Sequence, residues 1–523
     1  MFWEMRCMSR DNGSILVFNG RIFTGHRFVE SILISDGRVV YAGSSGEITE
    51  KSAGQGIERL DAQGMIVLPG LTDSHMHLLE TGTEMMMGTL KGYASIESMV
   101  SDLRNKCGKM PFLVSGGWDE ENFSERRLPE RKDLDRISTD APVMLFRFCH
   151  HVVSVNSFVI ERLGLEDAED VDGGIVGHDS SGRMNGILID RAIDYLLGYR
   201  SSLLQSIAAD AMCLAADYAI SRGITTLMSL DCDSLELQRC IELVSSKRMK
   251  CRLRLFLSKD TFSDYLASGA IPEDDMFRVA GVKLFADGSF GGRTALLSKP
   301  YEDSNTSGLC LMDVGDLTEE LRKAAAAGKM AAVHAIGDRA IANVLKAASD
   351  AQIPGNRLRI EHLALTPPEI VKRLSEFRPL LVVQPHFLVG DWWLPARLGD
   401  RAKHCYLFRT FAEKGLEPVG SSDSPVEPLD PWTGILSATD RGKHAGVEMS
   451  AITSSEAVDT IDAIKMYTAW SGKASNESGI IGSLEPGGYG DFIMMMEKDI
   501  DALLRNSMVM RSYVGGRLVF EVE

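Results

Sequence analysis

Eight short apolar segments, separated by longer stretches with helical periodicity, constrain the fold of this chain more than any other feature. Short apolar runs bounded by turn residues are typical of buried strands. The stretches between them, for example 317–327 and 370–377, have the spacing of crossover helices. Eight strand–helix units in one run predict an α/β protein with a closed parallel barrel, a (β/α)8 TIM barrel. The predicted strands lie at 65–68, 223–228, 252–257, 279–285, 330–334, 358–362, 380–383 and 416–420.

The two ends of the chain carry short alternating segments with turns between them, at 14–68 and 490–522. Neither end holds enough strands for a stable sheet of its own. The sequence therefore predicts a small β-sandwich domain built from both termini, residues 1–64 and 475–523, and a barrel domain at 65–474.

The stretch between the first two predicted strands is far longer than one crossover. It contains strand-like runs at 111–115 and 143–148 and a turn-rich segment at 171–175. Long insertions at the catalytic end of a barrel usually shape the substrate pocket. Residues 78–222 are therefore predicted to be largely an insertion over the active-site face.

The charge and cysteine pattern of the chain limit its partners. The 523 residues have a formal net charge of −17 and no dense Lys/Arg run, so we expect no nucleic acid or anionic membrane as a partner. No apolar run reaches the roughly 18 residues of a membrane helix, and the N-terminus lacks a signal-peptide layout. Nine cysteines without a C-x-x-C pair favour reduced thiols. We expect a cytoplasmic protein that acts on a small molecule and is compatible with a homodimer.

Ligand-type side chains follow several of the predicted strands. His75 and His77, in the segment PGLTDSHMH, project from one face of an extended chain and can grip one divalent metal. Carboxyl ends of barrel strands meet at one face, where His334, His362 and Asp423 should join them. In a chain with eleven histidines, a single histidine at a strand end can occur by chance. Four imidazoles and a carboxylate at one face instead predict a site for zinc or a similar metal.

Lys283 interrupts the apolar strand 279–285. A lysine inside a barrel strand is costly unless it is paired or neutralised. One interpretation is a side chain that reaches the rim, toward Asp287. The other is a carboxylated lysine, whose anionic carbamate can bridge two metal ions.

Asp423 follows the eighth predicted strand, and Gln384 and His386 follow the seventh. An aspartate is common in turns, but at this position it can also bind metal and accept a proton from water. A polar turn is an equally good interpretation of Gln384 and His386 from the residues alone.

Seven segments, in this order along the chain, resemble the motifs of the amidohydrolase superfamily, specifically the amidohydrolase-3 group of YtcJ-type metal-dependent hydrolases. The resemblance runs from about residue 14 to the C-terminus. Two segments depart from the pattern: 228–233 lacks a frequent histidine–aspartate pair, and 186–190 ends in Asp190 where glutamate is more common. The substrate of a relative is therefore not carried over. The seven segments are 69–77, 282–289, 334–339, 359–362, 384–386, 422–426 and 486–491.

The resemblance implies roles for the residues singled out above. One metal would be bound by His75, His77 and Asp423, and a second by His334 and His362, with a Lys283 carbamate between them. Gln384 and His386 would hold the substrate carbonyl or the leaving group.

We therefore expect a metal-dependent hydrolase that cleaves a non-peptide C–N bond of amide, formamide or carbamate type in a small molecule. One or two divalent ions, zinc by preference, would generate hydroxide from water near neutral pH, and Asp423 would accept the proton and pass it to the departing nitrogen. Two alternatives stay open. One is deamination or ester or lactone hydrolysis at the same site, and the other is a metal-binding regulator without catalysis.

Overall fold

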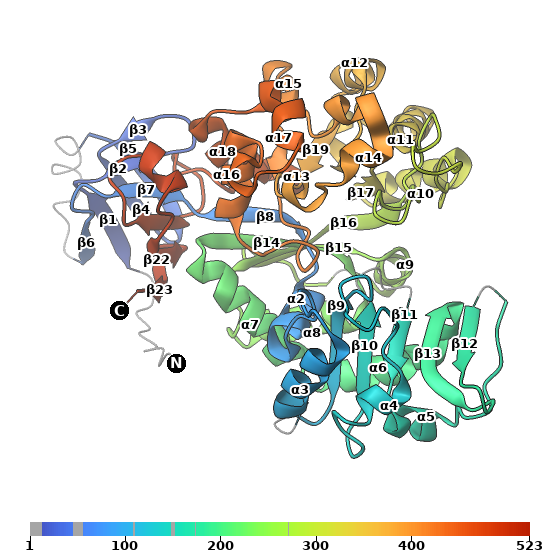
Figure 1. Cartoon of the computed structure of the whole chain (residues 1–523). Coiled ribbons are helices and arrows are strands. Elements are labelled where there is room, and N and C mark those ends of the chain that lie inside the picture. Colours follow the sequence, from blue (N-terminus) through green and yellow to red (C-terminus); the bar gives the residue numbers. More distant parts are fainter. Residues whose placement is uncertain are drawn as a thin grey trace. The chain divides into compact units, whose positions relative to one another are not determined.

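Figure 1 shows the computed structural model of the chain, which describes residues 13–44, 56–107, 110–147, 152–172, 174–269 and 271–522. The contacts divide the chain into two compact units. One combines residues 1–77 and 216–523, and the other holds 78–215. Each unit is described by itself.

The first unit contains an eight-stranded parallel sheet that closes into a barrel. Closure follows from two backbone hydrogen bonds between the first strand and the segment after the last: Asp423 N–H donates to His75 O over 2.7 Å, and His77 N–H donates to Ser424 O over 2.8 Å. The predicted TIM barrel is confirmed. In sheet order its strands are β8 (Leu71–Met76), β14 (Ile224–Cys232), β15 (Arg252–Leu257), β16 (Phe277–Phe285), β17 (Met330–Ala335), β18 (Leu358–His362), β19 (Leu380–Val383) and β20 (Val419–Gly420).

The first barrel strand is β8, and the prediction that it lies at 65–68 was wrong. That apolar run forms β7 (Ile66–Pro69), which pairs with strands of the terminal sheet. Gly70 lets the chain pass from one sheet to the next, since a Cβ there would lie 2.1 Å from Thr225 Oγ1. Both strands are fully buried, so their hydrophobicity does not distinguish them.

Helices follow the barrel strands and bury one apolar face each. The helix α10 (Val314–Ala326) begins where the Asp313 side chain accepts a hydrogen bond from Asp316 N–H, and it buries Leu317 and Leu321, one turn apart. The helical stretches predicted at 317–327 and 370–377 are confirmed by α10 and α12 (Pro368–Phe377). Other helices of this unit are α8 (Ser234–Ser245), α9 (Lys259–Ser268), α11 (Asp338–Ala351), α13 (Phe387–Gly390), α14 (Leu394–Leu398), α15 (Phe408–Glu413), α16 (Pro431–Asp440) and α18 (Thr460–Met466).

Two sheets built from both ends of the chain share one apolar core, as the sandwich prediction required (Figure 1). Ile15 and Ile32 enter this core from one sheet and Phe492 and Tyr513 from the other, with the last two rings stacked at 4.2 Å. The domain limits at 64/65 and 474/475 stay a prediction. The first sheet holds β5 (Arg38–Gly43), β4 (Ser31–Ser35), β1 (Ser14–Phe18) and β6 (Ile57–Asp61), and the second β23 (Arg517–Glu521), β22 (Val509–Val514), β21 (Phe492–Met495), β7, β2 (Arg21–Phe23) and β3 (Phe28–Val29).

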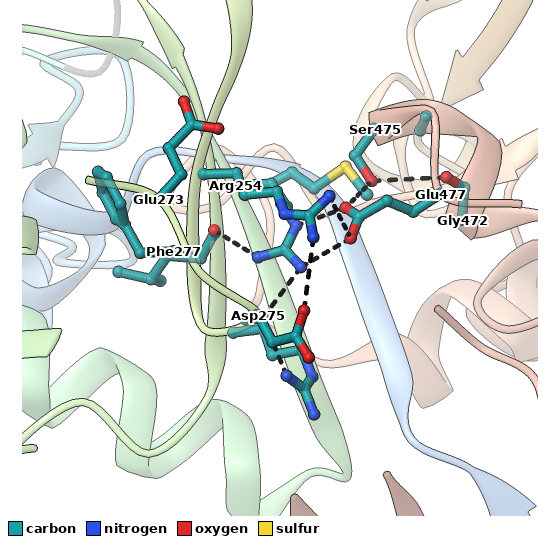
Figure 2. A network of polar contacts seen from close by, with 12 residues as sticks. Arg254, Glu273, Asp275, Phe277, Gly472, Ser475 and Glu477 are labelled. Atoms are coloured by element: carbon teal, nitrogen blue, oxygen red, sulfur yellow. Dashed lines mark hydrogen bonds and ion pairs between the residues drawn. The ribbon is translucent and has the colours of Figure 1, made fainter. Parts of the chain in front are cut away.

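Buried ion pairs connect β15 to the C-terminal part of the chain, and Figure 2 shows the pair of Arg254 and Glu477. Arg254 is fully buried and donates to both carboxylate oxygens of Glu477, over 2.5 and 2.9 Å. Arg252 makes the same kind of forked contact with Asp491, at 2.7 and 2.8 Å. Burial alone would raise the pKa of Glu477, but Arg254 outweighs it and holds that pKa below its usual range.

Glu477→Gln is expected to destabilise the protein by about 3–5 kcal/mol, because it leaves the Arg254 charge buried without its partner. Denaturant titration followed by fluorescence measures the change. Glu413→Gln is the matched control, since its pair with Arg409 is solvent-exposed and should contribute nothing measurable. Equal transitions for the two variants would contradict the expectation.

The second unit has its own sheet and core. Its five-stranded sheet contains the strands predicted near 111–115 and 143–148. Trp118 is fully buried there and donates its ring N–H to Leu145 O over 2.9 Å, so it is a structural aromatic residue. The predicted location of this unit over the active-site face stays a prediction. In sheet order the strands are β12 (Gly174–His178), β13 (Met184–Asp190), β11 (Val152–Val155), β10 (Val143–Arg147) and β9 (Leu113–Trp118), with helices α2 (Leu78–Met87), α3 (Ile96–Cys107), α5 (Ser157–Leu163) and α6 (Leu197–Gln205).

Within the described ranges, no single helix has the length and apolar character needed to cross a membrane. One bent pair, Arg191–Gln205 with Ala208–Ser221, meets the criterion by length and composition only.

Candidate metal centre

The barrel brings together four histidines that are far apart in the sequence. His75 lies in β8, His77 directly after it, His334 in β17, and His362 at the end of β18. The ring centres of His334 and His362 are 4.4 Å apart, those of His75 and His362 5.0 Å, and those of His75 and His77 5.7 Å. Four imidazoles therefore share one space at the carboxyl ends of the strands.

Asp423 completes a group of three ligand-type side chains. Its Oδ1 lies 3.1 Å from His75 Nε2 and 3.3 Å from His77 Nε2. Ligand atoms of the three residues all lie within 4.8 Å of one another, a spacing and donor set that suit a divalent cation. Burial alone would raise the pKa of Asp423, but the histidines, His75 first, outweigh it and hold that pKa well below its usual range. Asp423 is therefore ionised at neutral pH.

Hydrogen bonds on the outer side of the rings fix which nitrogen faces the centre. The Nδ1 atoms of His75, His77 and His362 are each occupied, which leaves Nε2 for a metal. His334 is reversed: its Nε2–H donates to Gly288 O over 3.1 Å, which leaves Nδ1. Metal-binding histidines commonly carry such partners, so this donor set fits a metal. The three Nδ1 partners are Glu361 Oε2 at 2.7 Å, Leu230 O at 3.0 Å and Gln384 Oε1 at 2.8 Å, respectively.

Two of the histidines are uncharged at neutral pH. Burial, reinforced by the nearby Lys283, lowers the pKa of His334 to about 3. Burial also lowers the pKa of His362 well below its usual range. The neutral imidazole is the form that binds metals, so both rings are ready for coordination without loss of a proton.

Lys283 lies in the centre of this group. Its Nζ is 3.2 Å from His75 Nε2, and the residue is 2% exposed. The rim interpretation does not fit, because Asp287 instead accepts backbone N–H groups of the neighbouring loops. Burial lowers the pKa of the Lys283 amine, and three carboxylates oppose this shift: Glu361, Asp423 and Asp231. Asp231 belongs to the segment that lacks the histidine–aspartate pair.

Of the two residues predicted after the seventh strand, Gln384 contacts a histidine of this centre and His386 contacts Glu427. Gln384 follows β19, bonds His362 through Oε1, and donates from Nε2 to Ser421 Oγ over 3.0 Å. It therefore orients the His362 ring. His386 precedes α13, and its Nδ1 lies 2.6 Å from Glu427 Oε2.

Two buried charged residues of the site were not predicted from the sequence. Glu361 bonds His75, and Arg359 holds both oxygens of Glu361, over 2.8 and 3.0 Å. A signal was present: Arg359 and Glu361 are two apart in an apolar strand, so both project from the same face. Glu427, by contrast, lies in a loop where no spacing marks it.

A family model described as "Amidohydrolase family" matches residues 58–520 of the chain. The chain belongs to the amidohydrolase family. This amidohydrolase is 30% identical over 512 residues to YtcJ of Bacillus subtilis (strain 168), a match that covers 94% of the chain and 96% of the relative. It is 24% identical over 555 residues to the N-substituted formamide deformylase of Arthrobacter pascens, with 99% of both covered.

Solved structures agree with the family assignment. The amidohydrolase matches the crystal structure of a metal-dependent hydrolase from Pyrococcus horikoshii OT3 with a TM-score of 0.82 and 31% identity, over 93% of this chain and 98% of that one. The amidohydrolase is thus a metal-dependent hydrolase, an enzyme that acts on carbon–nitrogen bonds.

Glu361→Gln is expected to weaken metal binding about 10–100-fold, the usual cost of removing a partner that orients a ligand. Competition with a chromophoric chelator measures the affinity. Circular dichroism checks that the variant is folded, because Arg359 loses its counter-charge. Glu369→Gln, at an exposed position of α12, is the control, and equal affinities of the two variants would show that Glu361 does not act on the metal.

Proposed function

We propose that this enzyme hydrolyses a non-peptide C–N bond of amide, formamide or carbamate type in a small molecule. The observation that carries the proposal is the ionised Asp423 held 3.1 and 3.3 Å from two imidazoles at the mouth of the barrel. A proton acceptor beside a cation site is what hydrolysis needs. The likeness to a formamide deformylase over 99% of the chain supports the bond type.

His75, His77 and Asp423 would hold one divalent ion, and His334 and His362 a second. Nitrogen and oxygen donors of this kind favour zinc. When bound, such ions polarise a carbonyl group and lower the pKa of water.

The chain's own residues would handle the protons and the ligands. Asp423 directs Oδ1 at His75 and His77, which leaves Oδ2 to accept a proton from the attacking water. Glu361 and Gln384 keep the rings of His75 and His362 in place.

We further propose that Lys283 is carboxylated. Its neutral amine attacks carbon dioxide, a C–N bond forms while one C–O π bond of carbon dioxide breaks, and one proton leaves to solvent, so a neutral side chain becomes an anion. Support comes from the buried position beside His75, where an ammonium ion is disfavoured. An anion there would offset the repulsion between two metal ions.

A substrate panel tests the proposed function. Metal-loaded enzyme is incubated with N-substituted formamides, amides and carbamates, and with esters, lactones and aminopurines. Release of an amine from the first group is the expected result. Ammonia from aminopurines alone, or turnover of esters and lactones alone, would replace the proposal by a deaminase or an esterase.

Substrate preference is expected to depend on the second unit. Replacing the β12–β13 hairpin with a short loop should change KM and the ranking of substrates while metal content stays the same, because 78–215 contains none of the six metal-binding candidates. Kinetics on the panel and elemental analysis measure both. An empty metal site in a folded deletion variant would reveal a ligand in this unit.

We propose a cytoplasmic location and a small-molecule substrate, with no nucleic-acid or membrane partner. The net charge of −17 and nine cysteines without a C-x-x-C pair support this. A homodimer is compatible with the chain, and light scattering would test it.

A further inference from the structure

A histidine–glutamate pair lies on the two segments that follow Gln384 and Asp423. His386 Nδ1 and Glu427 Oε2 are 2.6 Å apart, although 41 residues separate them in sequence. Their side chains are 19% and 15% exposed, so the pair is largely enclosed but reaches solvent. With Nδ1 occupied, Nε2 of His386 is the nitrogen that remains for a substrate.

Both members of the pair lie close in sequence to residues of the proposed metal centre. His386 lies two residues after Gln384, and the next residue, Phe387, stacks on the His362 ring at 5.9 Å and 9°. Glu427 follows a turn that begins at Asp423, where Val426 N–H donates to Asp423 O over 2.9 Å. The pair is therefore placed by the same two strand ends that place the metal ligands.

The backbone of α13 leaves room for the Glu427 carboxylate at Gly390. A Cβ on Gly390 would lie 2.1 Å from Glu427 Oε1, closer than any real contact. Glycine at this position leaves room for one carboxylate oxygen while the other meets His386.

Hydrolysis of an unactivated C–N bond needs a proton for the departing nitrogen, because an amide anion is too poor a leaving group. We propose that His386 is the catalytic residue that delivers this proton from Nε2, and that Glu427 is the positioning residue that holds its ring. This inference rests on the proposed function. A carboxylate on the far ring nitrogen fixes the ring and stabilises its cationic form.

The protons balance over one turnover. Water adds to the carbonyl carbon and gives one proton to Asp423. The C–N bond then breaks, its electron pair goes to nitrogen, and that nitrogen takes a proton from His386 Nε2. His386 regains a proton from solvent, and Asp423 releases its proton to solvent instead of passing it to the departing nitrogen. One water molecule is therefore consumed, and an acid and an amine are released.

Two substrates with the same formyl group and different leaving groups test the inference. N-butylformamide releases a strongly basic amine that must be protonated, whereas para-nitroformanilide releases an amine whose ring delocalises the electron pair. For His386→Ala and Glu427→Gln we expect kcat on N-butylformamide to fall about 100-fold or more and kcat on para-nitroformanilide less than about 10-fold. Metal content should not change.

Gly390→Ala tests the positioning role, because it keeps both side chains and displaces only the carboxylate. It should reproduce the leaving-group pattern in weaker form, and added imidazole should partly restore His386→Ala. Asp440→Asn is the control, since it alters a His–Asp contact of 2.8 Å between His444 and Asp440 on the surface.

Two failures are distinguishable. If the wild-type enzyme cleaves neither formamide nor the other C–N substrates, the proposed function is wrong. If it cleaves them but Glu427→Gln and His386→Ala slow both leaving groups equally, or not at all, the proton-delivery inference is overturned and the proposed function stands.

Discussion

Replacing His77 by alanine should abolish the metal-dependent activity while the barrel stays folded. His77 Nε2 lies 3.3 Å from Asp423, and its side chain is 23% exposed, so little packing is lost. Losing a metal removes several kcal/mol of transition-state stabilisation, which corresponds to at least about a 1000-fold fall in kcat/KM. His75→Ala should be as inactive but less stable, because His75 is fully buried against Glu361.

Elemental analysis and kinetics on the same samples measure both effects. His26→Ala, at an exposed position in the part of the chain that forms the sandwich, controls for loss of a histidine as such. A His77→Ala protein that keeps its metal and its activity would remove His77 from the ligand set.

Lys283→Ala should lose at least one metal ion per chain and most of the activity. Without the proposed carbamate, the two ions would face each other across about 3.5–4 Å with no anion between them. Added acetate or propionate should restore part of the activity by entering the space left by the side chain. Bicarbonate present during metal loading should raise the activity of the wild type.

A lysine that only packs in the barrel would behave differently. Lys283→Met, which keeps the length without the amine, would then retain metal, and carboxylates would rescue nothing. Lys329→Ala is the matched control. Lys329 lies just before the neighbouring strand β17 and pairs with Glu273. Two metals per chain in Lys283→Ala would rule out the carbamate.

Much of the fold could be predicted because barrel strands are buried and largely apolar, although β15 also carries Arg252 and Arg254 and β16 carries Lys283. Strands such as β15 and β19 were located from that pattern alone. The same pattern failed at β7 and β8, two consecutive buried strands on either side of Gly70. They belong to different sheets, and only tertiary pairing decides which is which.

In the candidate site, too, some residues could be predicted from the sequence and others could not. His75 and His77 were recognisable because their spacing works within one strand. Glu427 was not, because its role comes from a contact with His386 across 41 residues and from the bare backbone at Gly390. A partner that is created by folding leaves no local pattern.

The buried ion pairs between β15 and the C-terminal part of the chain have a consequence for the synthesis of the protein. Arg254 and Glu477 are 223 residues apart, and Arg252 and Asp491 are 239 apart. At 5–20 residues per second, the ribosome needs roughly ten to fifty seconds to make the carboxylates after the arginines have emerged. During that interval the two guanidinium groups lack the carboxylates of Glu477 and Asp491, so burial of β15 in its final place is unfavourable. We therefore expect the nascent barrel to remain open until translation is nearly finished.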